Sequence, residues 1–244
     1  MRQSQQSKGW VRCTLNTCST EERSTHVHHH RDCYITHLAP IYPNFPIPKF
    51  HSPQKNKKHK MATDDTTITS FKALAEAPRS IEEISKQERD CTLPCWNANV
   101  AFQLGCALRT RLLPFSKPTV IHISTISTPP HVLFHSVTTG GTALDNDFWV
   151  ARKRNAVIRF QTSTWLLQNK YEGDEEKFRV KNGLGESAKE YAIHGGGVPV
   201  FVRGVEGPVA VVVVSGLKQW DDHQVVVEEL MGVGKELEKM EKKA

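Results

Sequence analysis

The sequence lacks an apolar run long enough to cross a bilayer, because the longest valine-rich run, Val209–Val214, has only the length of a strand. The first 30 residues also lack the apolar stretch of a secretory signal. Cysteine is scarce after residue 60, where Cys91, Cys95 and Cys106 are an odd number without the spacing of a disulfide framework. These absences predict a cytoplasmic protein with free thiols and no membrane insertion.

Familiar catalytic and nucleotide-binding signatures are missing as well. Gly183-Leu184-Gly185 has no third glycine three residues on, and Gly234-Lys235 has no upstream P-loop glycine. The sequence contains no H-E-x-x-H, no paired C-x-x-C and no G-x-S-x-G. We predict no built metal site, because the histidines around His28, beside Cys33, lack the loop spacing of one and are interpreted as adventitious binders.

Positive charge is concentrated at the N-terminus. Residues 1–60 hold ten Lys or Arg against three Asp or Glu, whereas the rest of the chain holds 22 against 23. The basic balance therefore does not indicate nucleic-acid binding by the rest of the chain. Residues 1–60 also hold seven of the 12 histidines and five of the 13 prolines. We predict a disordered, basic, Pro/His-rich leader over 1–60 and a single domain over 61–244.

The domain alternates between helical and strand patterns. Apolar spacing and capping residues predict helices over 81–89, 97–113, 148–168 and 221–241, with one more helical turn at 186–191. Runs rich in β-branched residues predict strands over 119–126, 132–137, 198–202 and 209–214, paired as two hairpins. Residues 170–181 read as a charged, mobile link. The order predicts an α+β fold: an antiparallel sheet of four to five strands, with helices mainly on one face.

The second hairpin predicts a site. The turn from His194 through Gly195 and Gly196 precedes its first strand, and the turn Ser215–Leu217 follows its second. In an antiparallel hairpin the start of one strand lies beside the end of the other, so the two turns should be neighbours. Asp222 and His223 follow at the start of the last helix, where Asp222 is expected to cap the helix and His223 to lie close to His194.

Three cations, Arg152, Lys153 and Arg154, crowd the first two turns of the helix predicted from residue 148. Each opposes the helix dipole by about 0.3–1 kcal/mol, so a partner should hold them there. Two partners are open: local ion pairs with Asp145 and Asp147, or a bound anion. If these cations face the hairpin corner, the second alternative makes them an anion clamp.

Three segments carry a resemblance. Trp149–Lys153, Tyr191–Val200 and Val214–Leu217, the last followed by Asp222 and His223, resemble in sequence and in order the haem-degrading-domain superfamily. Within it they are similar to a small branch known only as an uncharacterised protein family. The resemblance implies a profilin-like α+β fold and frequent assembly into oligomers. In relatives the domain accompanies haem binding or degradation, corrinoid-linked enzymes and glycolate utilisation. The resemblance carries no agreed catalytic set.

These observations leave three functions open. The first is binding of a small molecule or tetrapyrrole, since His194 or His223 can supply an axial ligand for haem, with aromatic side chains and cations nearby. The second is a non-enzymatic adaptor, a homo-oligomer with protein partners, in which Trp220 anchors an interface. The third is an enzyme using Asp222 and His223, although adjacent helical side chains point apart. The ligand-binding candidates are Trp149, Arg152, Lys153, His194, Gly195, Gly196, Ser215, Gly216, Asp222 and His223.

Overall fold

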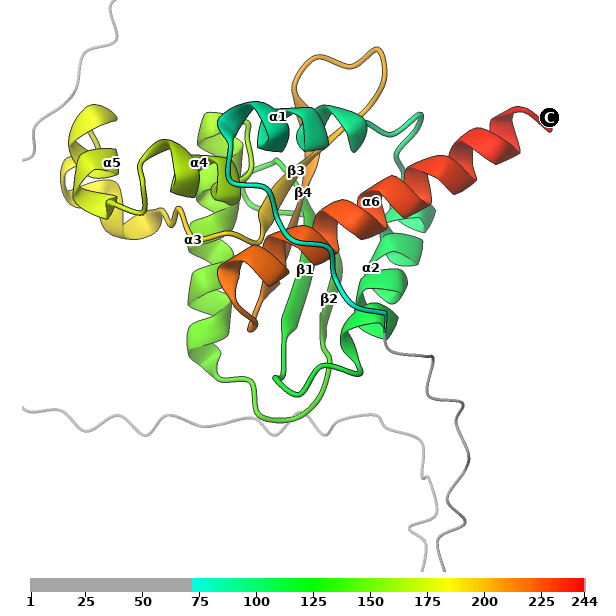
Figure 1. Cartoon of the computed structure of the whole chain (residues 1–244), viewed down its shortest axis with the longest axis horizontal. Helices are drawn as coiled ribbons and strands as arrows, with labels where there is room; N and C mark the ends of the chain where they lie inside the picture. The colour runs from blue at the N-terminus through cyan, green and yellow to red at the C-terminus, as the bar shows by residue number, and fades with distance from the viewer. Residues whose placement is uncertain (1–71, 244) are drawn as a thin grey trace, which may run out of the picture. The chain divides into compact units, whose positions relative to one another are not determined.

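Both predicted hairpins form, and they join into one antiparallel sheet (Figure 1). The computed structural model describes residues 72–243, so the predicted leader over 1–60 lies outside the described residues. The strands are β1 Val120–Thr125, β2 Val132–Val137, β3 Gly197–Phe201 and β4 Pro208–Ser215. Their order is β2-β1-β4-β3, which places β1 and β4 in the centre and β2 at an edge.

Six α-helices and one 3-10 helix accompany the sheet in the described part of the chain. They are α1 Ile81–Asp90, α2 Ala98–Leu112, α3 Leu144–Phe160, α4 Thr164–Lys170, α5 Glu175–Lys181, η1 Gly185–Glu190 and α6 Gln219–Glu241. The fold is the α+β architecture that the order of the elements predicts. Among residues 72–243, no helix combines the length and the apolar character that a membrane span requires.

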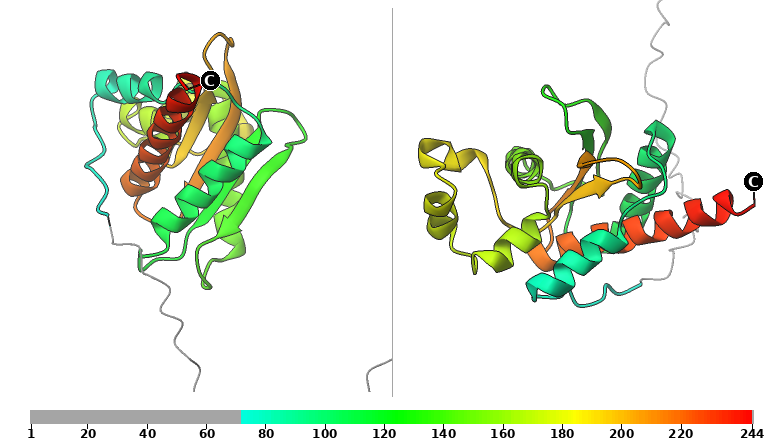
Figure 2. Two further views of the ribbon diagram at one scale, coloured as in Figure 1. Left: turned by 90° about the vertical axis from the view of Figure 1, so that its right-hand side faces the viewer. Right: turned by 90° about the horizontal axis from the view of Figure 1, so that it is seen from above.

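Helices cover both faces of the sheet, so the prediction that they lie mainly on one face is wrong (Figure 2). On one face, Ile121 and Ile123 of β1 pack in a large cluster with side chains of α2 and α6. On the other face, Val211 and Val213 of β4 pack with Val157 of α3. The alternation of strand side chains explains this, because nearly every β4 side chain is buried, whichever face it points to.

The predicted helix over 148–168 is two helices. Helix α3 starts earlier, at Leu144, and ends where Gln161 adopts a left-handed φ of 52°. Ser163 then caps α4, its hydroxyl accepting a hydrogen bond from the N–H of Leu166. The Gln-Thr-Ser sequence contains neither glycine nor proline, so the apolar pattern runs through the break and conceals it.

The predicted mobile link over 170–181 contains helix α5. Asp174 caps this helix by accepting a hydrogen bond from the N–H of Lys177 at 2.8 Å. Phe178 is buried in a small cluster with Tyr171 and Ile193. Because most of its neighbours in sequence are charged, Phe178 did not stand out as a buried residue in the sequence pattern.

An extended segment, 72–79, crosses α6 on the molecule's front face (Figure 1). Arg111 of α2 donates hydrogen bonds to the carbonyl oxygens of Lys72 and Ala73 and to the carboxylate of Glu228 on α6. The N–H of Ala75 donates to the same carboxylate at 2.8 Å. One arginine therefore ties this segment to two helices.

Two helical glycines give opposite predictions. A Cβ at Gly105 of α2 would collide with the ring of Phe134 on β2, whereas a Cβ at Gly232 of α6 would meet nothing within 4 Å. We expect Gly105→Ala to lower the free energy of unfolding by about 1–3 kcal/mol through overpacking. Gly232→Ala should raise it by up to about 1 kcal/mol, because alanine favours the helix.

Urea unfolding monitored by circular dichroism measures both changes. Adding Phe134→Leu to Gly105→Ala should recover part of the loss, because it removes the ring that the new methyl group meets. An unchanged midpoint in Gly105→Ala would contradict the close packing of α2 on β2.

Candidate functional site

The two turns of the second hairpin line one pocket with the starts of α3 and α6. His194 lies before β3, and Ser215, Gly216 and Leu217 follow β4, as the hairpin geometry predicts. The pocket has a volume of about 490 Å³. The lining residues are Asp145, Asn146, Trp149, Lys153, His194, Ser215, Gly216, Leu217, Lys218, Gln219, Trp220 and Asp222.

A buried ion pair lies in this pocket's lining. Lys153 Nζ lies 3.3 Å from Asp222 Oδ2 and donates to the carbonyl oxygen of Val214 at 3.0 Å. Both charged side chains are almost inaccessible, with 3% and 4% exposure. The pair connects α3 to α6 past the end of β4. Separating two such charges from water costs several kcal/mol per ion, so close contacts must compensate.

The Asp222 carboxylate also organises the turn that leads into α6. It accepts hydrogen bonds from the N–H of Leu217 at 2.9 Å and from that of Gly216 at 3.4 Å. Burial raises the pKa of the Asp222 carboxyl, while the Lys153 ammonium and these two N–H groups oppose the rise. Asp222 was expected to cap the helix. Instead α6 begins at Gln219, and Asp222 holds the turn that precedes it.

Glycine is required where the first turn meets the ion pair. Gly196 has a φ of 120°, which side chains rarely adopt, and a Cβ there would lie 2.8 Å from Lys153 Nζ and collide with the carbonyl oxygen of Val214. A Cβ at Gly195 would collide with the carbonyl oxygen of Gln219. The two glycines therefore let the turn approach both β4 and the start of α6.

Aromatic and cationic side chains form the rest of the pocket's surroundings. The rings of Trp149 and His194 meet edge to face at 5.0 Å between centroids, and the Arg152 guanidinium lies 4.6 Å from the Trp149 ring centroid. Glu175 of α5 brings its Oε1 to 3.4 Å from His194 Nδ1. Burial lowers the pKa of His194, and Glu175 opposes that shift.

Six of the predicted candidates line this pocket: Trp149, Lys153, His194, Ser215, Gly216 and Asp222. Gly195 and Gly196 shape the turn beside it. Arg152 lies behind Trp149, where its Nε donates to the carbonyl oxygen of Tyr191 at 3.2 Å.

His223 does not line the pocket. It is fully buried, and its ring packs 6.1 Å from the Trp165 ring. Its two ring nitrogens have no hydrogen-bond partner among the described residues. His194 lines this pocket and His223 does not, so the lining does not support the expectation that the two histidines share one site. Asp222 and His223 also form no pair with each other, because the contacts of Asp222 go to Lys153 and the preceding turn.

The predicted local ion pairs of the α3 cations do not form for Lys153 and Arg154. Lys153 pairs with Asp222, not with Asp145 or Asp147. Arg154 donates to Ser124 Oγ and to the carbonyl oxygens of Thr125 and Ser127 at the end of β1. Partners distant in sequence hold both cations, so no bound anion is needed to explain them.

Six lining residues were not among the predicted ligand-binding candidates: Asp145, Asn146, Leu217, Lys218, Gln219 and Trp220. Asp145 accepts a hydrogen bond from Trp149 Nε1 at 3.0 Å, a contact between residues one helical turn apart. The segment 217–220 joins a strand to a helix beside the predicted corner. Its position between a strand and a helix, beside the predicted corner, is the sequence signal that could have placed it in the pocket.

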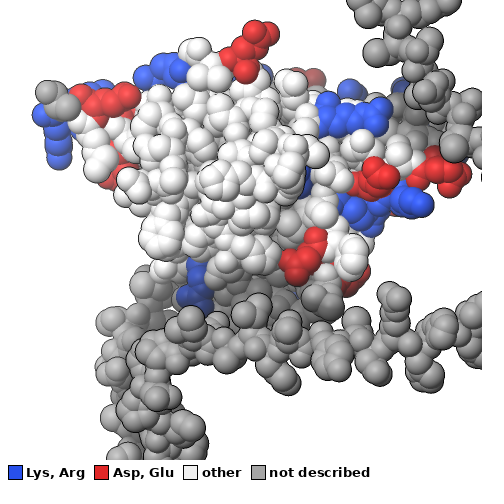
Figure 3. Space-filling view, turned by 180° about the vertical axis from the view of Figure 1, so that it is seen from behind, with Lys and Arg blue, Asp and Glu red and all other residues white. Residues whose placement is uncertain are grey.

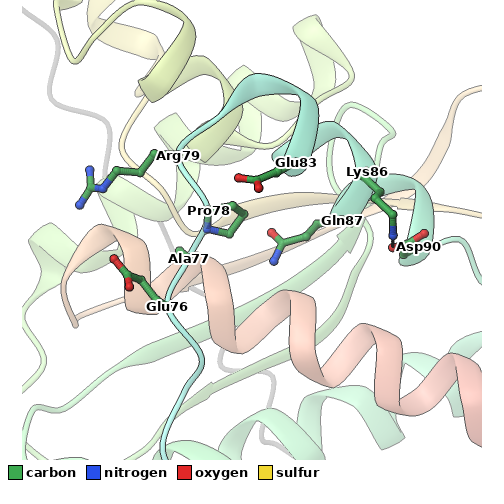
Figure 4. Close-up of a pocket in the computed structure, with 8 residues that line it drawn as sticks. All are labelled: Glu76, Ala77, Pro78, Arg79, Glu83, Lys86, Gln87 and Asp90. Atoms are coloured by element: carbon green, nitrogen blue, oxygen red, sulfur yellow. Dashed lines mark hydrogen bonds and ion pairs between the residues drawn. The ribbon is translucent and has the colours of Figure 1, made fainter.

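A second cavity of about 610 Å³ lies between the segment 72–79 and α1 (Figure 4). Charges of both signs line it, and Lys86 pairs with Asp90 there at 2.6 Å. It contains none of the predicted candidates, and its charged groups do not converge on one point (Figure 4). Within residues 72–243, no group of three or more His, Cys, Asp and Glu side chains is placed to hold a metal ion.

The burial of His223 predicts an acid-sensitive fold. Burial lowers the pKa of His223 from 6.5 to about 3, so the unfolded chain binds a proton at a higher pH than the folded chain. His223 therefore adds no penalty well above pH 6.5 and destabilises the fold as the pH falls from there toward 3. We expect His223→Leu to weaken the acid loss of stability.

Urea midpoints measured between pH 8 and pH 4 test this prediction. At pH 8, His223→Leu should lower the free energy of unfolding only slightly, because it removes two polar atoms without partners. His131→Ala, at an exposed histidine, is the control and should leave the acid profile unchanged. Identical profiles for His223→Leu and the unmodified chain would contradict the burial of a neutral imidazole.

Comparisons with known proteins agree with this architecture. The family model described as haem degrading protein HbpS-like matches residues 97–231. The UPF0303 protein YBR137W of Saccharomyces cerevisiae is 39% identical over 162 residues, covering 64% of this chain and 85% of that protein. The UPF0303 protein mlr5144 of Mesorhizobium japonicum is 35% identical over 147 residues, covering 60% of this chain and 84% of that protein. The crystal structure of Ybr137w protein matches with a TM-score of 0.58 and 38% identity, over 64% of this chain and 88% of that one. This chain therefore belongs to the HbpS-like haem-degrading-domain family and, within it, is a relative of the UPF0303 proteins.

Proposed function

We propose that this domain binds a small molecule in the pocket between the starts of α3 and α6. The pocket's volume of about 490 Å³ lies within the usual range for ligand sites. Trp149 and Trp220 give it aromatic surface, while His194, Lys218 and Gln219 give it polar groups. Specific ligand sites combine these two kinds of surface.

The observation that carries the proposal is the buried Lys153–Asp222 pair. Replacing a buried ion pair with apolar residues is often neutral or stabilising, so stability alone is a weak reason for keeping one. Here the pair fixes the turn 215–217 and the start of α6, both of which line the pocket. We infer that it holds the pocket open in a fixed shape, which lowers the cost of ordering a ligand site.

Haem is the ligand class that the family description favours, and the residues present meet its main requirements. His194 is the imidazole of the pocket, and Glu175 beside Nδ1 favours a proton there, which leaves Nε2 free as a ligand. Trp149, Trp220 and Leu217 supply apolar contacts, and Lys218 supplies a cation for a propionate. Bound haem would supply an iron centre for redox or oxygen chemistry. His223 is excluded as a ligand, since it is fully buried outside the pocket.

Absorbance titration of the full chain with hemin tests this proposal. We expect a saturable change in the Soret band, and we expect His194→Ala to weaken hemin binding by more than about tenfold, because the axial ligand is lost. His131→Ala is the matched control, since this exposed histidine lies on the β1–β2 turn away from the pocket residues.

Equal hemin binding by His194→Ala and the unmodified chain would reject His194 as the ligand. An unsaturable titration of the unmodified chain would reject haem. In that case quenching of tryptophan fluorescence by small-molecule libraries still tests the pocket, because Trp149 and Trp220 line it.

A second proposed function is assembly into a homo-oligomer that presents surfaces to protein partners. Seen from the side opposite α6, the molecule has few charged side chains in the middle of its surface, with charges of both signs around it (Figure 3). Leu144 and Phe148 of α3 are 81% and 70% exposed, and Val137 of β2 is also exposed. Strand β2 is an edge strand, whose free backbone groups can pair with another strand. A second copy offers the same uncharged surface.

Light scattering coupled to size exclusion tests assembly. We expect more than one copy per particle, and we expect Phe148→Glu to shift the particle toward the monomer, because it buries a charge in the contact. Met240→Glu is the control, since Met240 is equally apolar and exposed but lies at the far end of α6. A monomer at micromolar concentrations would reject this function.

We also propose a cytoplasmic setting, supported by the free thiols of Cys91, Cys95 and Cys106. An enzyme built on Asp222 and His223 is the weakest of the three functions. Among the described residues, the Asp222 carboxylate contacts Lys153, Gly216 and Leu217, and neither ring nitrogen of His223 has a hydrogen-bond partner.

A further inference from the structure

We propose that His122 and His135 form a binding site for a divalent transition-metal ion on the α3 side of the β1–β2 hairpin. The two residues are direct partners in the antiparallel register of β1 and β2. Their Nδ1 atoms lie 3.2 Å apart, and their rings are inclined at 71°. Neither residue lines the α3–α6 pocket, so this site is independent of the proposed ligand.

The separation of the two nitrogens fits a shared ion. Zinc–imidazole bonds of about 2.0–2.1 Å at a tetrahedral angle place two ligand nitrogens about 3.3 Å apart, and a right angle places them about 2.9 Å apart. The observed 3.2 Å lies between these two values. The same distance also fits a hydrogen bond between the two rings, and protection of His135 by Zn²⁺ distinguishes a metal site from that hydrogen bond.

A carboxylate lies behind one of the two imidazoles. Asp147 Oδ1 of α3 is 3.5 Å from His135 Nε2, on the side of the ring away from Nδ1. A carboxylate in this position favours the proton on Nε2 and leaves the Nδ1 lone pair for a metal ion. Metal-binding histidines commonly have such a partner.

Arg154 is a cation close enough to act on His122, and it has hydrogen-bond partners of its own. Arg154 of α3 donates to Ser124 Oγ at 2.8 Å and to the carbonyl oxygens of Thr125 and Ser127 at 2.7 and 2.8 Å. These contacts hold its guanidinium toward the end of β1. The negative charge of Asp147 opposes the repulsion between the Arg154 guanidinium and an incoming metal ion.

The site is open. The described residues provide no group of three or more His, Cys, Asp and Glu ligands, so two imidazoles bind the ion and water or another molecule completes its shell. His122 is buried and His135 is exposed, so the ion is held on one side and accessible on the other. Imidazole ligands favour Zn²⁺, Cu²⁺ and Ni²⁺ over Mg²⁺ and Ca²⁺.

A site-resolved experiment is needed, because residues 1–60 contain seven of the 12 histidines and can bind metal themselves. Diethyl pyrocarbonate modifies free imidazole nitrogens, and mass spectrometry of peptides locates each modified histidine. The full chain is treated with and without Zn²⁺ in excess over all its histidines. We expect Zn²⁺ to slow modification of His135 at least several-fold and to leave that of His131 unchanged.

His122→Ala should abolish the protection of His135 while His135 remains reactive. If that variant does not fold, Asp147→Asn serves instead, and the Zn²⁺ concentration for half protection should rise by about tenfold. Asp90→Asn, at an exposed aspartate on α1, is its control. Equal modification of His135 with and without Zn²⁺ would overturn the proposal and leave a hydrogen bond between the rings. Protection that persists in His122→Ala would overturn it as well.

Discussion

The buried contact between Lys153 and Asp222 is the constraint on which this corner of the molecule depends. Removing one member of such a pair costs about 3–5 kcal/mol, because the other charge stays buried without a partner. The contact also dictates its surroundings. A Cβ at Gly196 would meet Lys153 Nζ and the carbonyl oxygen of Val214, and the N–H of Gly216 donates to the Asp222 carboxylate. The glycines, the turn after β4 and the start of α6 are therefore one unit, and the pocket is its surface.

Strands were the most predictable part of the fold. The run Val132–Val137 is a strand with the bounds predicted for it, and the other three strands differ from their predicted bounds by one residue at each end. The helices were less predictable where a break had no chemical marker. Gln161 ends α3 in a left-handed conformation that is unusual for glutamine, and no glycine or proline announces it. Both faces of β4 are buried, which a uniform run of valines does not distinguish from one buried face.

The candidate site was predictable where it depends on hairpin geometry. His194 and Ser215 line one pocket because the first strand begins where the second ends. The partner of Lys153 was not predictable, since Asp222 lies 69 residues away and its carboxylate is brought into reach by the packing of α6. The burial of His223 was hidden for a similar reason. Its neighbour Trp165 belongs to α4, a helix that the sequence pattern merged with α3.

The length of helix α6 places its C-terminal end far from the pocket that its first turn lines. Its first turn contributes Gln219 and Trp220 to the pocket, and its last residue, Glu241, lies at the far end of 23 helical residues. At 1.5 Å per residue, these two ends are about 35 Å apart, and the last turns extend beyond the sheet (Figure 1). A fluorophore or surface tether attached after Glu241 would therefore stand clear of the pocket, on a spacer that the fold itself provides.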